Sequence, residues 1–201
     1  MIRTFLHVGS GSKYKDQTTS AFNSPDWAEV RFDIDPSGTP DILGSMLDMS
    51  GVATASMDAV YTSHNIEHVY AHEVPVALAE FRRVLKGDGF IVVTCPDLQA
   101  ICQLVAEDKL FEPAYNSPAG PIAPIDVLYG HRQSLAAGDL YMAHRCGFTQ
   151  KVLTGSLLAA GFAKVAARRR GYPHFDLWAV ASVNEQPDAA LQAVAILHVP
   201  K

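Results

Sequence analysis

The stretch that decides the fold is TFLHVGSG, residues 4–11, an apolar run that ends at two glycines one residue apart. A β-strand that ends in Gly-x-Gly lets the backbone turn sharply and lie against a ligand where a Cβ atom would clash. Nucleotide-type cofactors are held in this way in open α/β sheets. Two glycines by themselves are a weak signal, so a second feature is needed.

Asp33 supplies that second feature. It lies about 20 residues after the glycines, the spacing at which a second strand presents a carboxylate to a ribose diol. The residues before it, Val30-Arg31-Phe32, are typical of that strand. The pattern therefore predicts a nucleotide-type cofactor bound between residues 8–11 and Asp33.

Composition bounds the class of protein. The chain has 201 residues, of which 48% are hydrophobic, and this is enough for one core. We expect a single domain over residues 1–184 and a C-terminal tail, 185–201. The formal charge of -5 argues against a nucleic-acid or anionic-membrane partner. The basic run at residues 168–170 fits a solvated strand end, with a phosphate anchor as the alternative.

Hydropathy and cysteine spacing indicate the compartment. The apolar run near the start is too short for a secretion signal, and the sequence contains nothing like the ~20 apolar residues of a membrane span. Cys95, Cys102 and Cys146 lack C-x-x-C spacing, which favours reduced thiols over disulfides or a thiolate zinc site. We therefore expect a cytoplasmic protein with no membrane partner.

Hydrophobic periodicity predicts alternating strands and helices. The expected strands are 4–8, 30–32, 41–44, one within 57–64, 90–94, 163–168 and 175–183, and the expected helices are 74–85, 98–106 and 149–160. Gly87 is expected to end the first of these helices. Segment 10–26 lacks helical periodicity, whereas segment 107–148 is rich in proline and glycine and is interpreted as a substrate-side loop or lid.

Residues 57–97 resemble the class I S-adenosylmethionine-dependent methyltransferases, in particular the type 11-like members. The corresponding positions are Asp58-Ala59-Val60-Tyr61, His64, Glu67-His68, Glu80-Phe81-Arg82-Arg83-Val84-Leu85-Lys86, Gly89 and Pro96-Asp97. A thinner similarity extends over residues 6–183 and looks closest to small methyltransferases linked to polysaccharide and cell-surface sugar functions. The resemblance implies a Rossmann-like α/β fold. Its sheet would be mostly parallel and seven-stranded in the order 3-2-1-4-5-7-6, with helices on both faces and a C-terminal antiparallel hairpin.

The resemblance also implies a cofactor, S-adenosylmethionine, with S-adenosylhomocysteine as the product. Gly9 and Gly11 would line its methionine end, Asp33 would accept both ribose hydroxyls, and Ile34 would pack on adenine. The full set of cofactor-binding residues implied is Val8, Gly9, Ser10, Gly11, Asp33, Ile34, Asp35, Ser45, Met46, Leu47, Ser63 and His64. Lys13-Tyr14 replace the usual third glycine, so we expect an open cofactor cleft.

Three histidines are the candidate catalytic residues: His64, His131 and His144. Imidazole has an ordinary pKa near 6.5, which suits a general base at neutral pH. His64 would act as that base or would shape the methionine pocket by a hydrogen bond. His131 and His144, each followed by arginine, lie in loops that would overhang the crevice and face the acceptor or satisfy loop carbonyls.

A metal site is an alternative role for His64, Glu67 and His68. Some relatives, including small-RNA 3′-end methyltransferases, bind a divalent ion through a Glu-x-x-Glu-His cluster, and His64 would here replace the first glutamate. Side chains three or four residues apart converge on a helix, and His131 or His144 would complete the set. The Glu-His pair is also widespread in metal-free relatives, which favours a capping and packing role.

The function expected from these features is methyl transfer to an O or N atom of a small-molecule acceptor, such as a sugar or nucleotide-sugar. One alternative is a non-catalytic protein that binds S-adenosyl compounds. A NAD-dependent oxidoreductase is a second alternative, but Tyr14 stands where a dinucleotide motif requires glycine for close helix packing. The oligomeric state is open, a homodimer included.

Overall fold

The computed structural model describes residues 2–200 and contains a seven-stranded sheet and a separate two-stranded hairpin. The strands of the main sheet are β1 (Arg3–Val8), β2 (Trp27–Asp33), β3 (Ile42–Leu43), β4 (Met57–Ser63), β5 (Leu85–Pro96), β8 (Lys164–Arg170) and β9 (Asp176–Ser182). The small hairpin consists of β6 (Tyr115–Ser117) and β7 (Gly120–Ile122). The helices are α1 (Val74–Val84), α2 (Leu98–Ala106), α3 (Pro124–Tyr129), α4 (Arg132–Ala136), α5 (Gln150–Ala159) and α6 (Asp188–His198). Short 3-10 turns are η1 (Lys15–Gln17), η2 (Pro36–Gly38), η3 (Ile66–His68) and η4 (Leu140–Met142).

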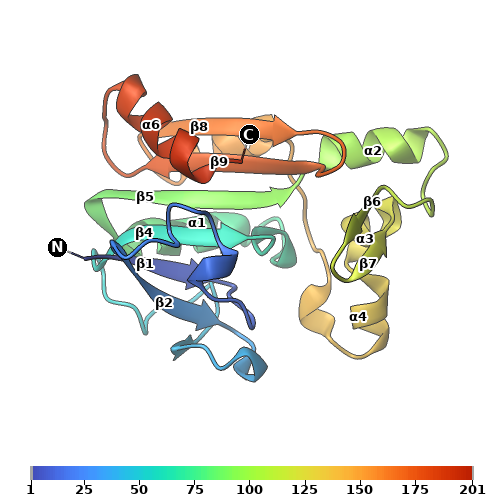
Figure 1. Ribbon diagram of the computed structural model, residues 1–201, viewed down its shortest axis with the longest axis horizontal. Helices are drawn as coiled ribbons and strands as arrows, with labels where there is room; N and C mark the ends of the chain where they lie inside the picture. Colours follow the sequence, from blue (N-terminus) through green and yellow to red (C-terminus); the bar gives the residue numbers. More distant parts are fainter. Residues whose placement is uncertain (1, 201) are drawn as a thin grey trace.

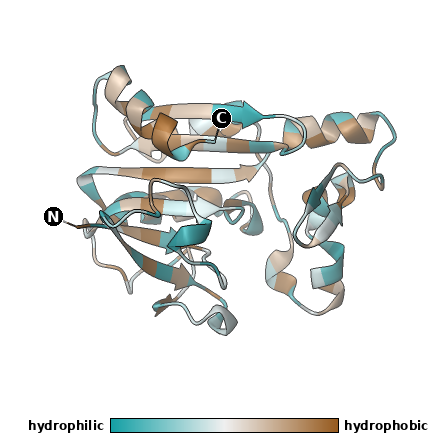
Figure 2. Cartoon of the chain, viewed as in Figure 1, coloured by the Kyte–Doolittle hydropathy of each residue, from teal (hydrophilic) through white to brown (hydrophobic). Residues whose placement is uncertain are grey.

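The strand order of the main sheet is β3-β2-β1-β4-β5-β9-β8 (Figure 1). Strands β1 to β5 are parallel, and β9 runs antiparallel to both β5 and β8. Counted within this sheet, the order is the predicted 3-2-1-4-5-7-6, and the predicted C-terminal hairpin is confirmed. Figure 2 shows the central strands as largely hydrophobic, as expected for a sheet that is covered on both faces.

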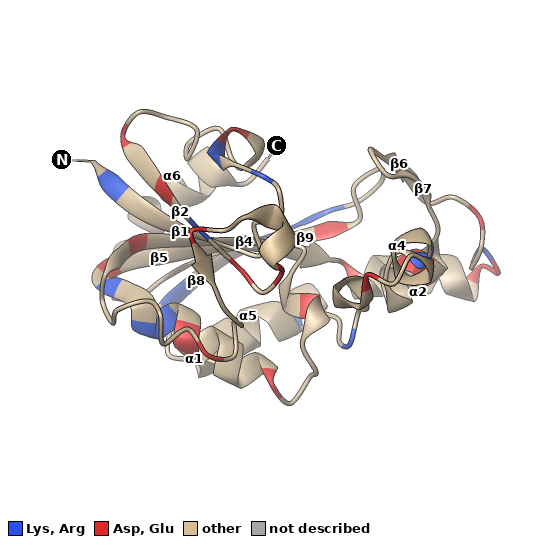
Figure 3. Ribbon diagram, turned by 90° about the horizontal axis from the view of Figure 1, so that it is seen from below, with Lys and Arg blue, Asp and Glu red and all other residues tan. Residues whose placement is uncertain are grey.

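Helices cover both faces of the sheet (Figure 3). On one face, α1 and α5 pack through Phe81, Leu153 and Leu157 onto inward residues of the sheet such as Leu6. On the other face, α6 and the segment between β1 and β2 cover Phe5, and Phe22 from that segment stacks on Phe5 with ring centroids 4.2 Å apart. The sheet is therefore the middle layer of three.

Helix α1 follows the predicted periodicity but ends earlier than predicted. Its buried residues recur at three- and four-residue steps: Val74, Ala77, Leu78, Phe81 and Val84. Pro75 lies in the first turn, where its missing N–H costs nothing. The predicted stop at Gly87 is wrong, because Leu85 already pairs with Met57 and begins β5. The pairing of Leu85 with β4 thus ends the helix before Gly87 is reached.

Residues 107–148 correct the prediction of an irregular segment. They form β6, β7, α3 and α4, which lie beyond the carboxyl ends of the parallel strands (Figure 1). Ile122 and Val127 from this segment pack on Ile101 of α2 in a small core of their own. Pro124 stands in the first turn of α3, where proline favours a helix, so proline content was a poor guide to irregularity here.

The N-terminal segment and the C-terminal tail complete the second face together. As predicted, residues 10–26 form no full helix, and η1 is their one regular turn. The tail, which the sequence did not place, forms α6 and buries His198 to 4% exposure. The ring of His198 lies 4.3 Å from that of Phe22, and its Nδ1 lies 2.8 Å from Thr19 Oγ1.

The basic run on β8 is more than a solvated strand end. Arg169 pairs with the buried Asp97 at 2.6 Å, and Arg170 pairs with the buried Asp176. The Arg169–Asp97 pair connects the hairpin to the start of α2, whereas the Arg170–Asp176 pair joins β8 to β9 within the hairpin. Between residues 2 and 200, no helix has both the length and the hydropathy needed to cross a bilayer.

Burial of His198 predicts a loss of stability in mild acid. Burial lowers the pKa of His198 from 6.5 to about 4, so between these values the unfolded chain binds a proton that the folded chain does not. The free energy of unfolding should therefore fall as pH drops from 7 toward 4, with His198 contributing about 3 kcal/mol. Burial also lowers the pKa of His7 and His144, which act in the same direction.

Urea denaturation at a series of pH values between 7 and 4.5 measures this effect. In His198→Gln the dependence of unfolding free energy on pH should be flatter than in the wild type, whatever the variant loses in packing. His72→Gln is the matched control, because the side chain of His72 is exposed. Parallel pH profiles for His198→Gln and the wild type would contradict the assignment.

Candidate functional site

A cleft of about 360 Å³ lies at the carboxyl ends of β1, β2 and β4. The predicted cofactor residues that line it are Val8, Gly9, Gly11, Asp33, Ile34, Asp35, Ser45, Met46, Leu47 and His64. Ser10 is buried beneath the glycine bend and Ser63 is half-buried at the end of β4, and the cleft wall includes neither. Most of the set implied by the resemblance therefore converges on one cavity.

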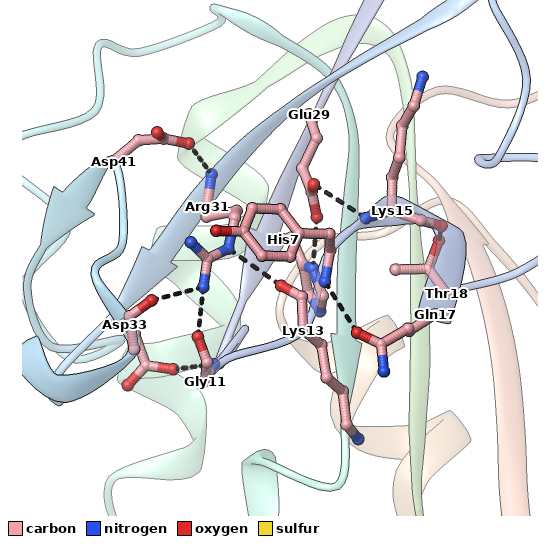
Figure 4. Close-up of polar contacts among 12 residues, drawn as sticks. His7, Gly11, Lys13, Lys15, Gln17, Thr18, Glu29, Arg31, Asp33 and Asp41 are labelled. Carbon is pink, nitrogen blue, oxygen red and sulfur yellow. Dashed lines mark hydrogen bonds and ion pairs between the residues drawn. The ribbon is translucent and has the colours of Figure 1, made fainter.

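Asp33 holds the glycine bend and faces the cleft. Its Oδ2 accepts the N–H of Gly11 at 2.6 Å (Figure 4), and its Oδ1 accepts the N–H of Asp35 at 2.8 Å. Each carboxylate oxygen keeps a further lone pair, so both can accept hydroxyl protons as well. Beside it, the apolar side chain of Ile34 is 46% exposed. A carboxylate next to an exposed apolar surface fits an adenosine.

Gly9 is required by close contact as well as by backbone conformation. Its φ is +69°, and a Cβ atom there would lie 2.1 Å from the side-chain nitrogen of Asn65. The Gly9 N–H donates to the carbonyl of Phe32 at 2.9 Å, which ties the bend to β2. The bend is thus held between β2 and the loop after β4.

Arg31, which the sequence analysis did not select, connects the two loops at the cofactor end of the cleft. Its guanidinium is buried and donates to the carbonyls of Lys13, at 2.9 Å, and Gly11 (Figure 4). It also donates to the carbonyls of Gly38 at 2.7 Å and Thr39 at 2.9 Å. A buried charge needs partners, and four carbonyls provide them. The one feature of the sequence that could have identified Arg31 is its position as a charged residue between two apolar residues of an inner strand.

A second hollow, of about 320 Å³, adjoins the cofactor cleft. It is lined by Glu67, Pro96, Leu98, Val127, Leu128, Tyr129, His144, Arg145, Cys146 and Gly147. Arg145 lines both cavities, and the walls that α2 and α3 contribute are apolar. Burial, followed by the charge of Glu67, raises the pKa of the Cys146 thiol to about 11, so this thiol stays protonated at neutral pH.

Glu67 lines the second hollow, and the next residue, His68, lines the cofactor cleft. It is 1% exposed, and His64 Nδ1 lies 3.6 Å from its Oε1, which is too far for a hydrogen bond. Burial raises the pKa of this carboxyl, but His64, His68 and His144 together outweigh that effect and hold the pKa below its ordinary value. Glu67 is therefore a buried carboxylate surrounded by histidines.

The three candidate catalytic histidines have different positions. His64 lines the cofactor cleft, with φ at +51° and a side chain that is 46% exposed. His144 lines the second hollow, and burial lowers its pKa. His131 lies outside both cavities, and its Nδ1 is 2.9 Å from Ser134 Oγ. Beside it, Arg132 is paired with Asp126 at 2.6 Å.

Comparison with known proteins agrees with this geometry. Residues 19–93 match the family model described as a methyltransferase domain. The chain has the class I methyltransferase fold. The sequence resemblance to S-adenosylmethionine-dependent methyltransferases is thereby confirmed, and this methyltransferase fold implies S-adenosylmethionine as cofactor. No curated protein sequence matches the chain.

Several solved methyltransferases share this fold. The Burkholderia thailandensis 1,6-didemethyltoxoflavin-N1-methyltransferase, solved with 1,6-didemethyltoxoflavin and S-adenosylhomocysteine, is 16% identical, with a TM-score of 0.58 over 92% of this chain and 72% of that one. A Thermotoga maritima methyltransferase is 13% identical, with a TM-score of 0.57 over 92% of this chain and 84% of that one. A chain of the Haloferax volcanii complex that contains the methyltransferase activator Trm112 matches at 12% identity and a TM-score of 0.57, over 91% of this chain and 83% of that one.

The contacts of Arg31 predict that its removal destabilises the protein. In Arg31→Met the carbonyls that it binds lose their donor while still partly buried, which should lower the free energy of unfolding by about 2–4 kcal/mol. Urea denaturation measures the loss.

Arg3→Met is the matched control, because Arg3 also stacks on an aromatic ring, that of Trp27 at 4.1 Å, but its side chain is exposed. Its effect should stay within about 0.5 kcal/mol. Equal losses in the two variants would show that the buried hydrogen bonds of Arg31 contribute little.

Proposed function

We propose that this methyltransferase transfers a methyl group from S-adenosylmethionine to an O or N atom of a small molecule, such as a sugar or nucleotide-sugar. The observation that carries the proposal is the position of Asp33. Its carboxylate faces a cleft beside the Gly9 bend, at adjacent ends of two parallel strands. Ligands of open α/β sheets bind at such carboxyl ends.

The second hollow is the proposed acceptor site. It opens beside the cofactor cleft, and residues 107–148, our proposed substrate-side segment, supply Val127, Tyr129 and His144 to its wall. A small molecule seated there would be shielded by apolar walls while its polar group met Glu67, His144 or Arg145. This arrangement would hold the acceptor atom close to the methyl group.

Positioning of the cofactor and the acceptor would provide much of the rate acceleration of methyl transfer. When bound, S-adenosylmethionine supplies a methyl group on a sulfonium; the acceptor lone pair takes the methyl carbon as the C–S bond breaks, leaving S-adenosylhomocysteine. Holding the two reactants in line accounts for much of such an acceleration. A hydroxyl acceptor must also lose a proton, and His64 and His144 are the proposed bases, since each lines one of the cavities.

A NAD-dependent oxidoreductase is less well supported. Dinucleotide sites place the pyrophosphate at the N-terminus of the helix that follows β1. In this chain the described residues 10–26 contain only η1 there, and Tyr14 stacks on Arg31 at 4.2 Å. A protein that binds S-adenosyl compounds without catalysis remains the alternative that a turnover assay tests.

Replacing the ribose-binding carboxylate tests the cofactor site. In Asp33→Asn, one acceptor oxygen is kept for the backbone, but charge-assisted hydrogen bonds worth ~1.5–3 kcal/mol each are lost. Calorimetry with S-adenosylmethionine and S-adenosylhomocysteine should show affinities at least tenfold weaker than in the wild type.

Asp88→Asn is the control, because Asp88 is exposed at the opposite end of the sheet, and its affinities should match the wild type. NAD serves as the competing ligand in the same experiment. Binding of NAD in preference to both S-adenosyl compounds, or unchanged affinity in Asp33→Asn, would contradict the proposal.

Turnover separates an enzyme from a binding protein. Fractions of sugars, nucleotide-sugars and small amines are incubated with enzyme and S-adenosylmethionine, and release of S-adenosylhomocysteine is measured. With an active fraction, His64→Gln should lower kcat at least tenfold with little change in cofactor affinity if His64 is the base. If His64 shapes the methionine pocket instead, the affinity should fall. Cofactor binding without turnover in any fraction would favour the binding protein.

A further inference from the structure

The junction between the two cavities contains more hydrogen-bond acceptors than donors. Glu67 is fully enclosed, and neither of its carboxylate oxygens has a hydrogen-bond partner among residues 2–200. Arg145 does not supply one, and its guanidinium lies over the ring of Tyr70, 4.9 Å from the ring centroid. A buried carboxylate that accepts no hydrogen bond lowers the stability of the folded chain, so a cation bound beside Glu67 would be stabilising.

His144 adds a free lone pair. Its Nδ1 lies 2.6 Å from the carbonyl oxygen of Val127. A carbonyl only accepts, so Nδ1 must carry the proton and donate. In the neutral ring, Nε2 is then an unprotonated acceptor. Metal-binding histidines characteristically donate their second ring N–H to a backbone carbonyl in this way.

His68 has the same arrangement. Its Nδ1 lies 3.1 Å from the carbonyl oxygen of Ala143, and its Nε2 lies 3.2 Å from the carbonyl oxygen of His64. With the proton on Nδ1, Nε2 and the His64 oxygen are two acceptors that face each other. Such a pair needs a shared cation, which is either a second proton or a metal ion.

We propose that Glu67, His68 and His144 bind one divalent transition-metal ion. Each of the three offers a ligand atom, and these atoms all lie within 4.8 Å of one another. Bonds from zinc to nitrogen or oxygen are about 2.0–2.2 Å, so two ligand atoms of one ion lie at most about 4.4 Å apart. In a tetrahedral site the ligand atoms lie about 3.4 Å apart, so ion binding would draw these three atoms closer together.

Of the residues considered in the sequence, the structure brings together Glu67, His68 and His144. It leaves out His64, whose ring lies toward the cofactor cleft, and His131, which is held elsewhere by Ser134. Two imidazoles and one carboxylate favour zinc, cobalt or iron over magnesium and calcium, which prefer oxygen ligands. Three protein ligands also leave a coordination position open.

The proposal does not depend on methyl transfer, because ion binding is measured without cofactor or acceptor. The competing explanation is that the cluster only packs and shares protons. Under that explanation Glu67 pairs with protonated imidazoles, and no metal ion is bound. The two explanations differ in one measurable quantity, the metal content of the folded chain.

The experiment uses the full chain without a histidine tag, stripped with a chelator and titrated with Co²⁺. We expect one Co²⁺ per chain, seen by its visible absorption and by elemental analysis, with displacement by Zn²⁺ but not by millimolar Mg²⁺. Glu67→Gln and His144→Gln should each weaken binding at least tenfold. Circular dichroism establishes that both variants are folded.

His131→Gln is the matched control, since it removes a histidine of the same segment that lies outside the cluster, and it should bind Co²⁺ as tightly as the wild type. Failure of the folded wild-type chain to take up Co²⁺ or Zn²⁺ would overturn the proposal. Uptake that survives in both Glu67→Gln and His144→Gln, or displacement by Mg²⁺, would overturn it equally.

Discussion

The cleft at the carboxyl ends of β1 and β2 depends on the buried guanidinium of Arg31. In many open α/β proteins the first glycine turn leads into a helix whose N-terminal amides fix the loop and attract a charged ligand. Here residues 10–26 wind over the sheet with one short turn. Arg31 reaches from β2 to the carbonyls of Gly11 and Gly38, so a charge–dipole contact fixes the loop instead.

Glu67 has a comparable position on the other side of the cleft. Residues near the end of β4 bring it under the loop that contains Arg145, whose N–H donates to the Glu67 carbonyl at 2.8 Å. Its carboxylate is buried and belongs to the wall of the second hollow. Neither carboxylate oxygen has a hydrogen-bond partner among residues 2–200, and this is the basis of the metal-site proposal.

Much of the sheet was predictable because local patterns determine it. Gly9 and Asp33 mark the ends of β1 and β2, and the apolar steps of α1 identify a helix that crosses between two parallel strands. Prediction from local patterns failed where strand pairing or tertiary packing favoured a different structure. Leu85 joined β5 although the helical pattern included it, and the proline-rich residues 107–148 folded onto α2.

The sequence by itself predicted most strands, the main helices and the candidate carboxylate, since periodicity of two or 3.6 residues and a glycine turn are local properties. The strand order was implied by the resemblance to a known family. Only the tertiary structure decided which histidines meet. His144 joins Glu67 and His68, whereas His131 does not, and His198 reaches Thr19 from the far end of the chain. The physical reason is that these contacts form between loops and termini, which are far apart in the sequence. The paths of such segments depend on long-range packing and on the requirement that buried polar groups form hydrogen bonds.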